Sequence, residues 1–416
     1  RFDAVKLLLE AGADRGHLQW TPLIEAVALG SVEDVERLIA AGAPLEEKDW
    51  WERTAFLVAL LVGDLDKAQL LRERGADVKA RGRCGAPPLF YAVQGHHPHV
   101  LRWLLSLGQE VDQRDEFERT ALMEAVESAD VDCVDLLIAA GADVDHEAPC
   151  GHVLSHAQTK AVALRLLDAG ADPQHLSQEG QRALCGLGPV GGALEGVSLE
   201  DFQRGRTRRF GAANPERMQE PFWEAMVRTG NNAFVAARAF VPGREHDGPP
   251  VWCAQRFGQS ITLLPDGRVV QIAGEHEDYY DPDFCIYNDV FVHDGQGGIT
   301  LFGYPADVFP PTDFHTATLM DGVVYVIGAL GYQGTRQYGH TPVYRLDLAT
   351  LRMEPLATAG AAPGWIYGHR AERIGPHEIR IRGGTVVTAR GGEEIHTENT
   401  AAFILDVSRL AWGREG

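Results

Sequence analysis

The chain has 416 residues, of which 45% are hydrophobic and 23% charged, and its formal net charge is -21. This length predicts more than one domain, and the composition excludes a chain that is disordered throughout. The negative charge disfavours nucleic-acid binding, because that function needs a basic surface to contact phosphate. We therefore expect any charged partner of this chain to be basic.

The six cysteines are scattered through the sequence, without a C-x-x-C pair of the kind that serves zinc or redox sites. No apolar run reaches the roughly 20 residues that span a bilayer. These two observations predict a reduced, soluble, cytoplasmic protein. Arginine supplies most of the 38 cationic side chains, which favours a GC-rich bacterial source.

A motif recurs at a fixed period in residues 1–185. The motif at Glu52–Phe56 returns at Glu118–Leu122, and the helix-starting position of Thr54 recurs at multiples of 33 residues. Each unit predicts two short helices, and a glycine ends the second helix where left-handed backbone is needed. These glycines are Gly42, Gly75, Gly108, Gly141 and Gly170. Because one unit cannot bury its own apolar face, neighbouring units must stack.

This pattern resembles the ankyrin repeat, a turn followed by two antiparallel helices. The resemblance implies an α-solenoid over residues 1–185 that binds protein partners along a concave groove and at the turn tips. The groove is predicted to be apolar in its middle and acidic at one end, which suits a partner with an apolar anchor and a basic flank. The predicted partner-binding residues are Trp50, Trp51, Val58, Leu61, Tyr91, Phe117, Glu124 and Glu127. The alternative is that the tip aromatics pack within the chain and the glutamates form only a solvated face.

A glycine-rich stretch indicates a boundary after the repeats, and residues 186–214 are predicted to be a linker. A helical hairpin is predicted over residues 215–250, with its first helix starting at Asn214-Pro215 and its second capped by Asn231 or Asn232. A short basic cluster is predicted to dock onto an acidic face such as the repeat array: Arg204, Arg206, Arg208 and Arg209.

Residues 251–416 carry a second repeat with the spacing of short strands. Gly274, Gly328 and Gly383 lie 54 and 55 residues apart, each at the end of an apolar strand. Each unit predicts a first strand, a second strand and, after a polar loop, a third strand. The predicted strands are 259–264, 269–274 and 290–294, then 315–320, 323–328 and 343–347, then 369–374, 378–384 and 402–406.

This second pattern resembles the kelch repeat, which implies about three four-stranded β-propeller blades. The predicted fold class is therefore multidomain α plus β, with an ankyrin α-solenoid, a helical hairpin and a kelch-like all-β domain. Three blades fall short of a ring, which usually has about 4 to 8. We expect either a homodimer that completes the propeller or further blades within residues 186–250.

Loops of the strand repeats carry many ionisable residues, which a propeller would gather at one mouth. This mouth is a candidate pocket, and its residues are Arg256, His276, Asp313, His315, His340, His369, Arg370 and His396. The alternative is that they form hydrogen bonds at strand starts. One acidic loop offers candidate ligands for a divalent cation, namely Glu275, His276, Asp278, Asp281 and Asp283. No other cofactor is expected.

The leading functional prediction is a protein–protein interaction scaffold with an ankyrin groove and a kelch-like face. The alternative is an enzyme, or a receptor for a small ligand or metal, that uses the mouth. The sequence contains no nucleophile elbow, P-loop, dinucleotide fingerprint or H-E-x-x-H motif. No catalytic residue is therefore assigned.

Overall fold

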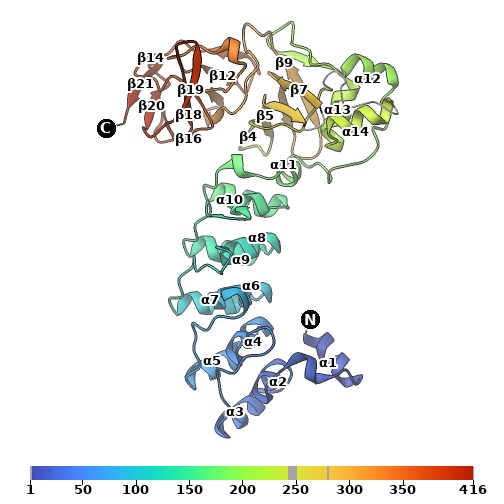
Figure 1. The fold of residues 1–416 in the computed structure, drawn as a ribbon, viewed down its shortest axis with the longest axis vertical. Helices are drawn as coiled ribbons and strands as arrows, with labels where there is room; N and C mark the ends of the chain where they lie inside the picture. Colours follow the sequence, from blue (N-terminus) through green and yellow to red (C-terminus); the bar gives the residue numbers. More distant parts are fainter. Residues whose placement is uncertain (1, 242–250, 279–280, 416) are drawn as a thin grey trace. The chain divides into compact units, whose positions relative to one another are not determined.

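The computed structural model describes residues 2–241, 251–278 and 281–415. The chain divides into two compact units, Arg1–Gly180 and Gln181–Gly416. The N-terminal unit is helical, and the C-terminal unit combines three short helices with β-sheets (Figure 1). None of the described helices is both long and apolar enough to span a bilayer.

Paired helices build the N-terminal unit, as the period predicts. The pairs are α2 (Pro22–Leu29) with α3 (Val32–Ala40), α4 (Ala55–Val62) with α5 (Leu65–Glu73), α6 (Pro88–Gln94) with α7 (Pro98–Ser106), and α8 (Ala121–Glu127) with α9 (Val131–Ala139). Helix α1 (Phe2–Glu10) precedes them, and α10 (Lys160–Asp168) and α11 (Gln178–Leu184) follow. Before α10, the first helix of the pair is reduced to a 3-10 turn at Val153–His156.

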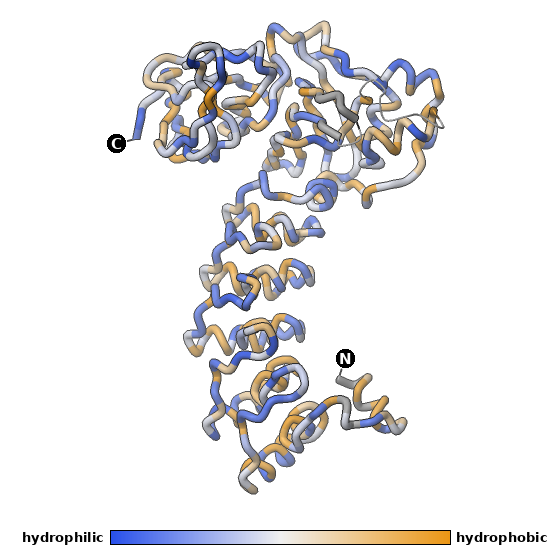
Figure 2. The backbone as a smooth tube through the Cα atoms, in the orientation of Figure 1, coloured by the Kyte–Doolittle hydropathy of each residue, from blue (hydrophilic) through white to orange (hydrophobic). Residues whose placement is uncertain are grey.

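Threonine at the start of the first helix explains why the motif repeats. The side chains of Thr21, Thr54 and Thr120 each accept a hydrogen bond from the backbone N–H three residues later, at 3.2, 3.4 and 3.4 Å. This bond satisfies one of the N–H groups that the first turn of a helix leaves unpaired. The helices that follow bury their apolar residues against neighbouring units, and Figure 2 shows apolar segments recurring along the stack.

Three sheets form most of the C-terminal unit, and each contains four consecutive antiparallel strands. Sheet 1 contains β4 (Ser260–Leu263), β5 (Val269–Ile272), β8 (Val290–His293) and β9 (Ile299–Gly303). Sheet 2 contains β10 (Thr316–Met320), β11 (Val323–Ile327), β12 (Val343–Asp347) and β13 (Met353–Pro355). Sheet 3 contains β16 (Arg370–Arg373), β17 (Glu378–Arg382), β20 (Phe403–Asp406) and β21 (Ala411–Arg414). The nine predicted strands are confirmed, and each sheet adds a fourth.

Each sheet has its insertion between the second and third strands. In sheet 1 it is the hairpin of β6 (Glu275–Asp278) and β7 (Asp281–Ile286), and in sheet 2 it is the loop 328–342. In sheet 3 it is the hairpin of β18 (Thr385–Arg390) and β19 (Glu393–Glu398), which β15 (Trp365–Tyr367) extends. Two further strands lengthen the outer edges, β3 (Glu216–Met218) beside β9 and β14 (Ala359–Gly360) beside β21.

The region between the repeats differs from its prediction. The helix expected from Asn214-Pro215 begins instead at Pro221, because Asn214 bonds the backbone of Met353 through both side-chain atoms and the chain then enters β3. The second helix starts after Asn232, as predicted. The linker contains an unpredicted helix, so the helical layer consists of α12 (Leu199–Gly205), α13 (Pro221–Thr229) and α14 (Ala233–Phe240).

The basic cluster is used inside the C-terminal unit. Arg204 pairs with Asp201 at 2.6 Å and with Glu220 at 3.0 Å, and Arg209 pairs with Glu216 at 2.8 Å. Arg208 donates to a backbone carbonyl of β7. Arg204 and Arg209 therefore pair with neighbouring carboxylates of their own unit, and docking of the cluster onto the repeat array stays a prediction.

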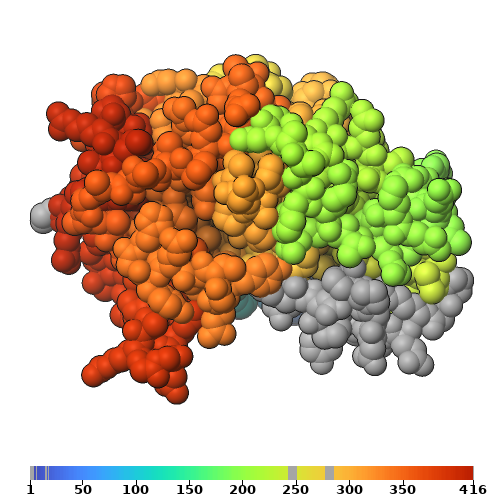
Figure 3. Space-filling view, turned by 90° about the horizontal axis from the view of Figure 1, so that it is seen from above, coloured from blue at the N-terminus to red at the C-terminus, as the bar shows by residue number. Residues whose placement is uncertain are grey.

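The helices and the three sheets pack in sequence against one another. On sheet 1, Phe291 and Leu301 face α12 to α14, whereas Val270 and Ile272 face sheet 2. Sheet 2 turns its other side, which includes Ile327, toward sheet 3. Figure 3 shows the segment with α12 to α14 (green) at the surface beside the later strands (orange to red). The helices therefore cover the apolar face of sheet 1 that an additional blade would otherwise bury.

The outer face of sheet 3 is charged. Arg380 pairs there with Glu372 at 2.7 Å and with Glu415 at 3.2 Å, while Ile379 and Ile381 point inward. In the described residues the sheets do not close into a ring. A charged face of this kind does not require a partner to bury it, so the homodimer stays a prediction without structural support.

Candidate functional site

Turn tips recur along one edge of the N-terminal unit. Residues with positive φ recur in these tips at positions 33 apart: Gln19, Glu52, Gly85, Glu118 and Gly151. Neighbouring tips are joined by backbone bonds, from Arg83 N–H to the Trp51 carbonyl at 3.3 Å and from Glu116 N–H to the Cys84 carbonyl at 2.9 Å. The tips therefore form one continuous surface.

Buried or half-buried aspartates hold two of these tips. Asp49 accepts hydrogen bonds from the backbone N–H groups of Trp51 and Arg53, both at 2.9 Å, and forms a 2.6 Å ion pair with Arg53. Asp115 lies at the same position of its unit and accepts hydrogen bonds from the backbone N–H groups of Phe117 and Arg119, both at 2.9 Å. Sequence reasoning missed these anchors, although the recurrence of Asp-x-x-x-Arg before the threonine cap would have revealed them.

Aromatic side chains stand on the anchored tips. Trp50, Trp51 and Phe117 are 51%, 50% and 59% exposed. The two tryptophan rings meet edge to face at 5.0 Å, and the Arg83 guanidinium lies 5.2 Å from the centre of each. We call Trp50, Trp51, Arg83 and Phe117 the aromatic tip surface. The tryptophans contact a neighbouring tip, as the alternative predicted, and still expose half of their surface, so their role in partner binding stays a prediction.

Replacement of Asp49 by Ala is expected to lower the free energy of unfolding of the N-terminal unit by about 2 kcal/mol, because two backbone N–H groups and a poorly exposed guanidinium lose their acceptor. Chemical denaturation followed by helical circular dichroism measures this change. Glu52→Gln is the control, since Glu52 is exposed at the same tip and should alter stability by less than about 0.5 kcal/mol. Equal stability of Asp49→Ala and Glu52→Gln would contradict the anchoring role.

The predicted groove is not open at its centre. Val58 is fully buried and Tyr91 is 5% exposed, so neither presents side-chain surface to a partner, and Leu61 is half-buried. A Cβ atom at Gly82 would lie 1.9 Å from the Tyr91 hydroxyl, which shows how closely the tip covers this ring. Burial also raises the pKa of Tyr91 to about 12. The assignment of Val58 and Tyr91 as contact residues was therefore wrong.

The acidic end of the groove already contains its own basic side chains. Arg119 pairs with Glu124 at 3.2 Å and with Glu127 at 2.5 Å, and His156 lies 3.0 Å from Glu127. Burial raises the pKa of Glu124 above its usual value. Arg119 partly neutralises both carboxylates. These glutamates therefore attract a basic partner less than the sequence suggests.

Two histidines of the predicted mouth connect neighbouring sheets. His315 Nε2 lies 2.8 Å from the Ser260 hydroxyl of β4, and His369 Nε2 lies 2.9 Å from the Thr316 hydroxyl of β10. Both rings are almost fully buried. The same histidine–hydroxyl contact therefore joins sheet 1 to sheet 2 and sheet 2 to sheet 3. It matches the alternative that these residues form hydrogen bonds at strand starts.

Arg256 is also buried. Its guanidinium forms an ion pair with Asp289, with one bond at 3.0 Å, and lies 3.6 Å from the centre of the Tyr287 ring. Asp313 is buried as well and accepts a 2.6 Å bond from Gly331 N–H, and burial raises its pKa. These two residues are therefore inaccessible to a ligand.

The structure describes the side chains of two of the five predicted cation ligands. Glu275 and His276 are buried in β6, whereas for Asp278, Asp281 and Asp283 the structure describes the backbone and not the side chains. Within the described part, no group of three or more His, Cys, Asp or Glu side chains is placed to hold a metal ion. The divalent-cation site stays a prediction.

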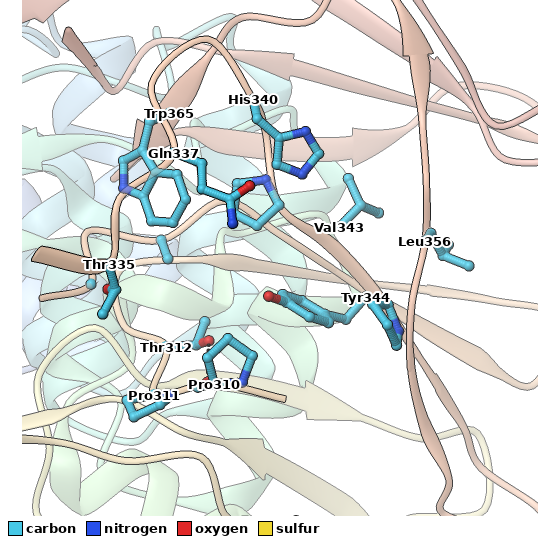
Figure 4. Close-up of a pocket in the computed structure, with 14 residues that line it drawn as sticks. Pro310, Pro311, Thr312, Thr335, Gln337, His340, Val343, Tyr344, Leu356 and Trp365 are labelled. Carbon is cyan, nitrogen blue, oxygen red and sulfur yellow. Dashed lines mark hydrogen bonds between the residues drawn. The ribbon is translucent and has the colours of Figure 1, made fainter. Parts of the chain in front are cut away.

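The remaining mouth residues are dispersed. Arg370 is half-buried on β16, and the exposed His396 lies on β19, 3.2 Å from the Tyr367 hydroxyl. His340 is exposed and lines a cavity of about 290 Å³ near sheet 2 (Figure 4). Of the eight predicted residues, His340 is the one that lines this cavity, and the aromatic residues beside it, Tyr344 and Trp365, were missed.

Comparisons with known proteins concern the N-terminal unit. A family model described as ankyrin repeats (3 copies) matches residues 1–82 and 57–148. Ankyrin repeat protein nuc-2 of Neurospora crassa is 27% identical over 148 residues, which are 34% of this chain and 14% of that protein. A putative ankyrin repeat-containing protein of Treponema pallidum is 38% identical over 108 residues, 25% of this chain and 36% of that protein. Ankyrin repeat domain-containing protein 63 of Homo sapiens is 30% identical over 138 residues, 31% of this chain and 36% of that protein.

The matches establish ankyrin repeats in the N-terminal part of the chain. The chain spans between 14% and 36% of the length of the three relatives named above. The matched residues of the family model end at 148, so the kelch resemblance of residues 251–416 receives no support from it.

Proposed function

We propose, from the premise that the N-terminal part is an array of ankyrin repeats, that this chain is a scaffold that binds a protein segment at the aromatic tip surface. The observation that carries the proposal is the half-exposed trio of Trp50, Trp51 and Phe117 on anchored, mutually bonded tips. Aromatic and arginine side chains dominate binding energy at protein interfaces, and rigid ones lose little entropy on binding.

The partner that suits this surface has apolar anchors and a basic flank. The rings and the stacked Arg83 offer apolar area, and Glu52 and Glu116 are exposed beside them. The described residues give neither glutamate an ion pair, in contrast to the Arg119-bound glutamates of the groove. The proposed contact therefore moves from the groove to the tips, and the basic flank would meet these two carboxylates.

Replacement of Trp51 by Ala is expected to weaken binding of such a segment about tenfold or more, since an anchor of this size contributes at least about 1.4 kcal/mol. Peptides would first be selected from a displayed random library on the full chain, and their affinities then measured by calorimetry. Trp50→Ala and Phe117→Ala should act in the same direction.

Phe257→Ala is the matched control, because Phe257 is an aromatic residue 63% exposed in the other unit. Its replacement should leave the affinity unchanged. Failure to select any peptide would contradict the proposal, as would peptides that bind the Trp51→Ala variant as tightly as the unaltered chain.

We also propose that the three sheets are kelch-like blades in an open stack. The four-stranded meanders, their insertions at one position and the two histidine bonds between neighbouring sheets support this. The use of His315 and His369 within the fold favours the scaffold over an enzyme at the mouth.

A further inference from the structure

A cavity of about 290 Å³ lies beside sheet 2 in the C-terminal unit. Its walls come from the segment before β10, the loop between β11 and β12, the start of β12, the end of β13 with the residue after it, and the start of β15. A cavity of about 150 Å³ admits benzene, so this one has room for a substituted ring or a bicyclic ring system. Its volume is at the small end of ligand sites in proteins.

The cavity walls are held in place before any ligand arrives. Four prolines line them, and the ring of each fixes its own backbone torsion: Pro310, Pro311, Pro342 and Pro355. Tyr344 packs edge to face on Phe309 at 5.1 Å, and the Trp365 indole N–H donates a 2.9 Å bond to the Leu330 carbonyl. Both aromatic rings that face the cavity are therefore oriented by contacts behind them.

The loop over the cavity is fastened at its middle. Arg336 donates to the carbonyls of Leu330 and Gly331 at 2.9 and 3.0 Å, and it forms a poorly exposed ion pair with Glu394. The Tyr338 hydroxyl donates a 2.7 Å bond to the same carboxylate. These bonds fix the loop that presents Gln337 and His340, so the polar groups of the cavity are also positioned.

Five polar side chains line the cavity, and the hydroxyls of two of them, Thr312 and Thr335, are already bonded to backbone carbonyls. In Figure 4 the Tyr344 hydroxyl points toward the open centre, with Gln337 and His340 above it. No hydrogen bond joins this hydroxyl to another described residue, while Thr312 is already bonded to Pro310 at 2.7 Å. Burial raises the pKa of Tyr344 to about 12, so its hydroxyl is protonated and able to donate at neutral pH. None of the 14 described lining residues is Asp, Glu, Lys or Arg.

We propose that this cavity binds one neutral aromatic small molecule, its ring between Trp365 and Tyr344 and the prolines, with a hydroxyl or carbonyl substituent bonded to Tyr344 and Gln337. A charged ligand is disfavoured because it would lose hydration and no Asp, Glu, Lys or Arg lines the cavity to pair with it. The site goes beyond the proposed scaffold function and does not depend on it, since every lining residue belongs to the C-terminal unit.

The test uses 2-naphthol as the neutral probe and 2-naphthoate as its charged counterpart, both with the full chain, by saturation-transfer NMR and calorimetry. We expect 2-naphthol to bind with a Kd at or below about 1 mM and 2-naphthoate at least about tenfold more weakly. Tyr344→Phe should weaken 2-naphthol about fivefold, the effect of one neutral hydrogen bond.

Gln337→Trp should abolish binding by filling the cavity from an exposed loop position, where folding is not at risk. Gln333→Trp, on the same loop but outside the lining, is the control and should bind like the unaltered chain. The proposal is overturned if 2-naphthol does not bind, if Gln337→Trp binds it unchanged, or if 2-naphthoate binds as tightly. Tenfold tighter binding of N-acetyl-tyrosinamide than of 2-naphthol would instead indicate a site for a peptide side chain.

Discussion

Replacement of Arg256 by Ala is expected to lower the free energy of unfolding of the C-terminal unit by about 3–5 kcal/mol, the cost of leaving one partner of a buried ion pair alone. The Arg256 side chain is fully buried and that of Asp289 is 5% exposed. The guanidinium also donates to the Cys253 and Ala273 carbonyls at 2.9 and 3.1 Å. Its loss leaves a buried carboxylate and two carbonyls without their donor.

Hydrogen exchange of β5 and β8 amides in increasing denaturant measures this change within the C-terminal unit alone. Arg268→Ala is the control, because Arg268 forms its 2.8 Å pair with Asp266 while 39% exposed. It should cost less than about 1 kcal/mol. A loss below about 1 kcal/mol for Arg256→Ala would show that the buried pair does not hold the unit together.

The C-terminal unit is expected to lose stability as the pH falls from about 6.5 to 4, because its buried histidines are neutral when folded. Burial lowers the pKa of His315 and of His369 to about 3, and that of His293 to about 4. The unfolded chain takes up protons near pH 6.5, whereas the folded chain takes them up only near these lower values. The unfolded state therefore binds more protons within this window, and stability decreases by about 1.4 kcal/mol per pH unit for each histidine.

Urea unfolding of the C-terminal unit at pH 7, 6 and 5 measures this slope. His369→Gln retains a hydrogen-bonding group toward Thr316 but removes the titration, so its slope should be smaller by about 1.4 kcal/mol per pH unit. His377→Gln, at an exposed position, should leave the slope as it is. A slope that is the same in His369→Gln and in the unaltered chain would refute the assignment to this buried ring.

The local pattern of the sequence was sufficient to predict most helices and strands of both units. The side chains of Thr54 and Thr120 cap their helices by accepting a hydrogen bond from the backbone N–H three residues later. This contact is local, so the sequence pattern is enough to predict it. The apolar run of β11 likewise predicts a strand, and in the structure Val324 and Val326 pack on one face while Ile327 packs on the other. Where a distant residue intervenes the prediction failed, as at Asn214, which bonds Met353 instead of starting a helix.

The sequence by itself determined the repeat periods, the helix pairs, the strand triplets and the exposed aromatic residues at the tips, because each follows from contacts within one unit. Only the tertiary structure decided that Val58 and Tyr91 are buried, that Arg119 occupies the acidic end of the groove, and that His315 and His369 join sheets. It also decided that helices and a charged face cover the ends of the sheet stack. Burial and pairing depend on which neighbour packs against a side chain. That neighbour lies 5 and 8 residues away for Arg119, and 55 and 53 residues away for His315 and His369.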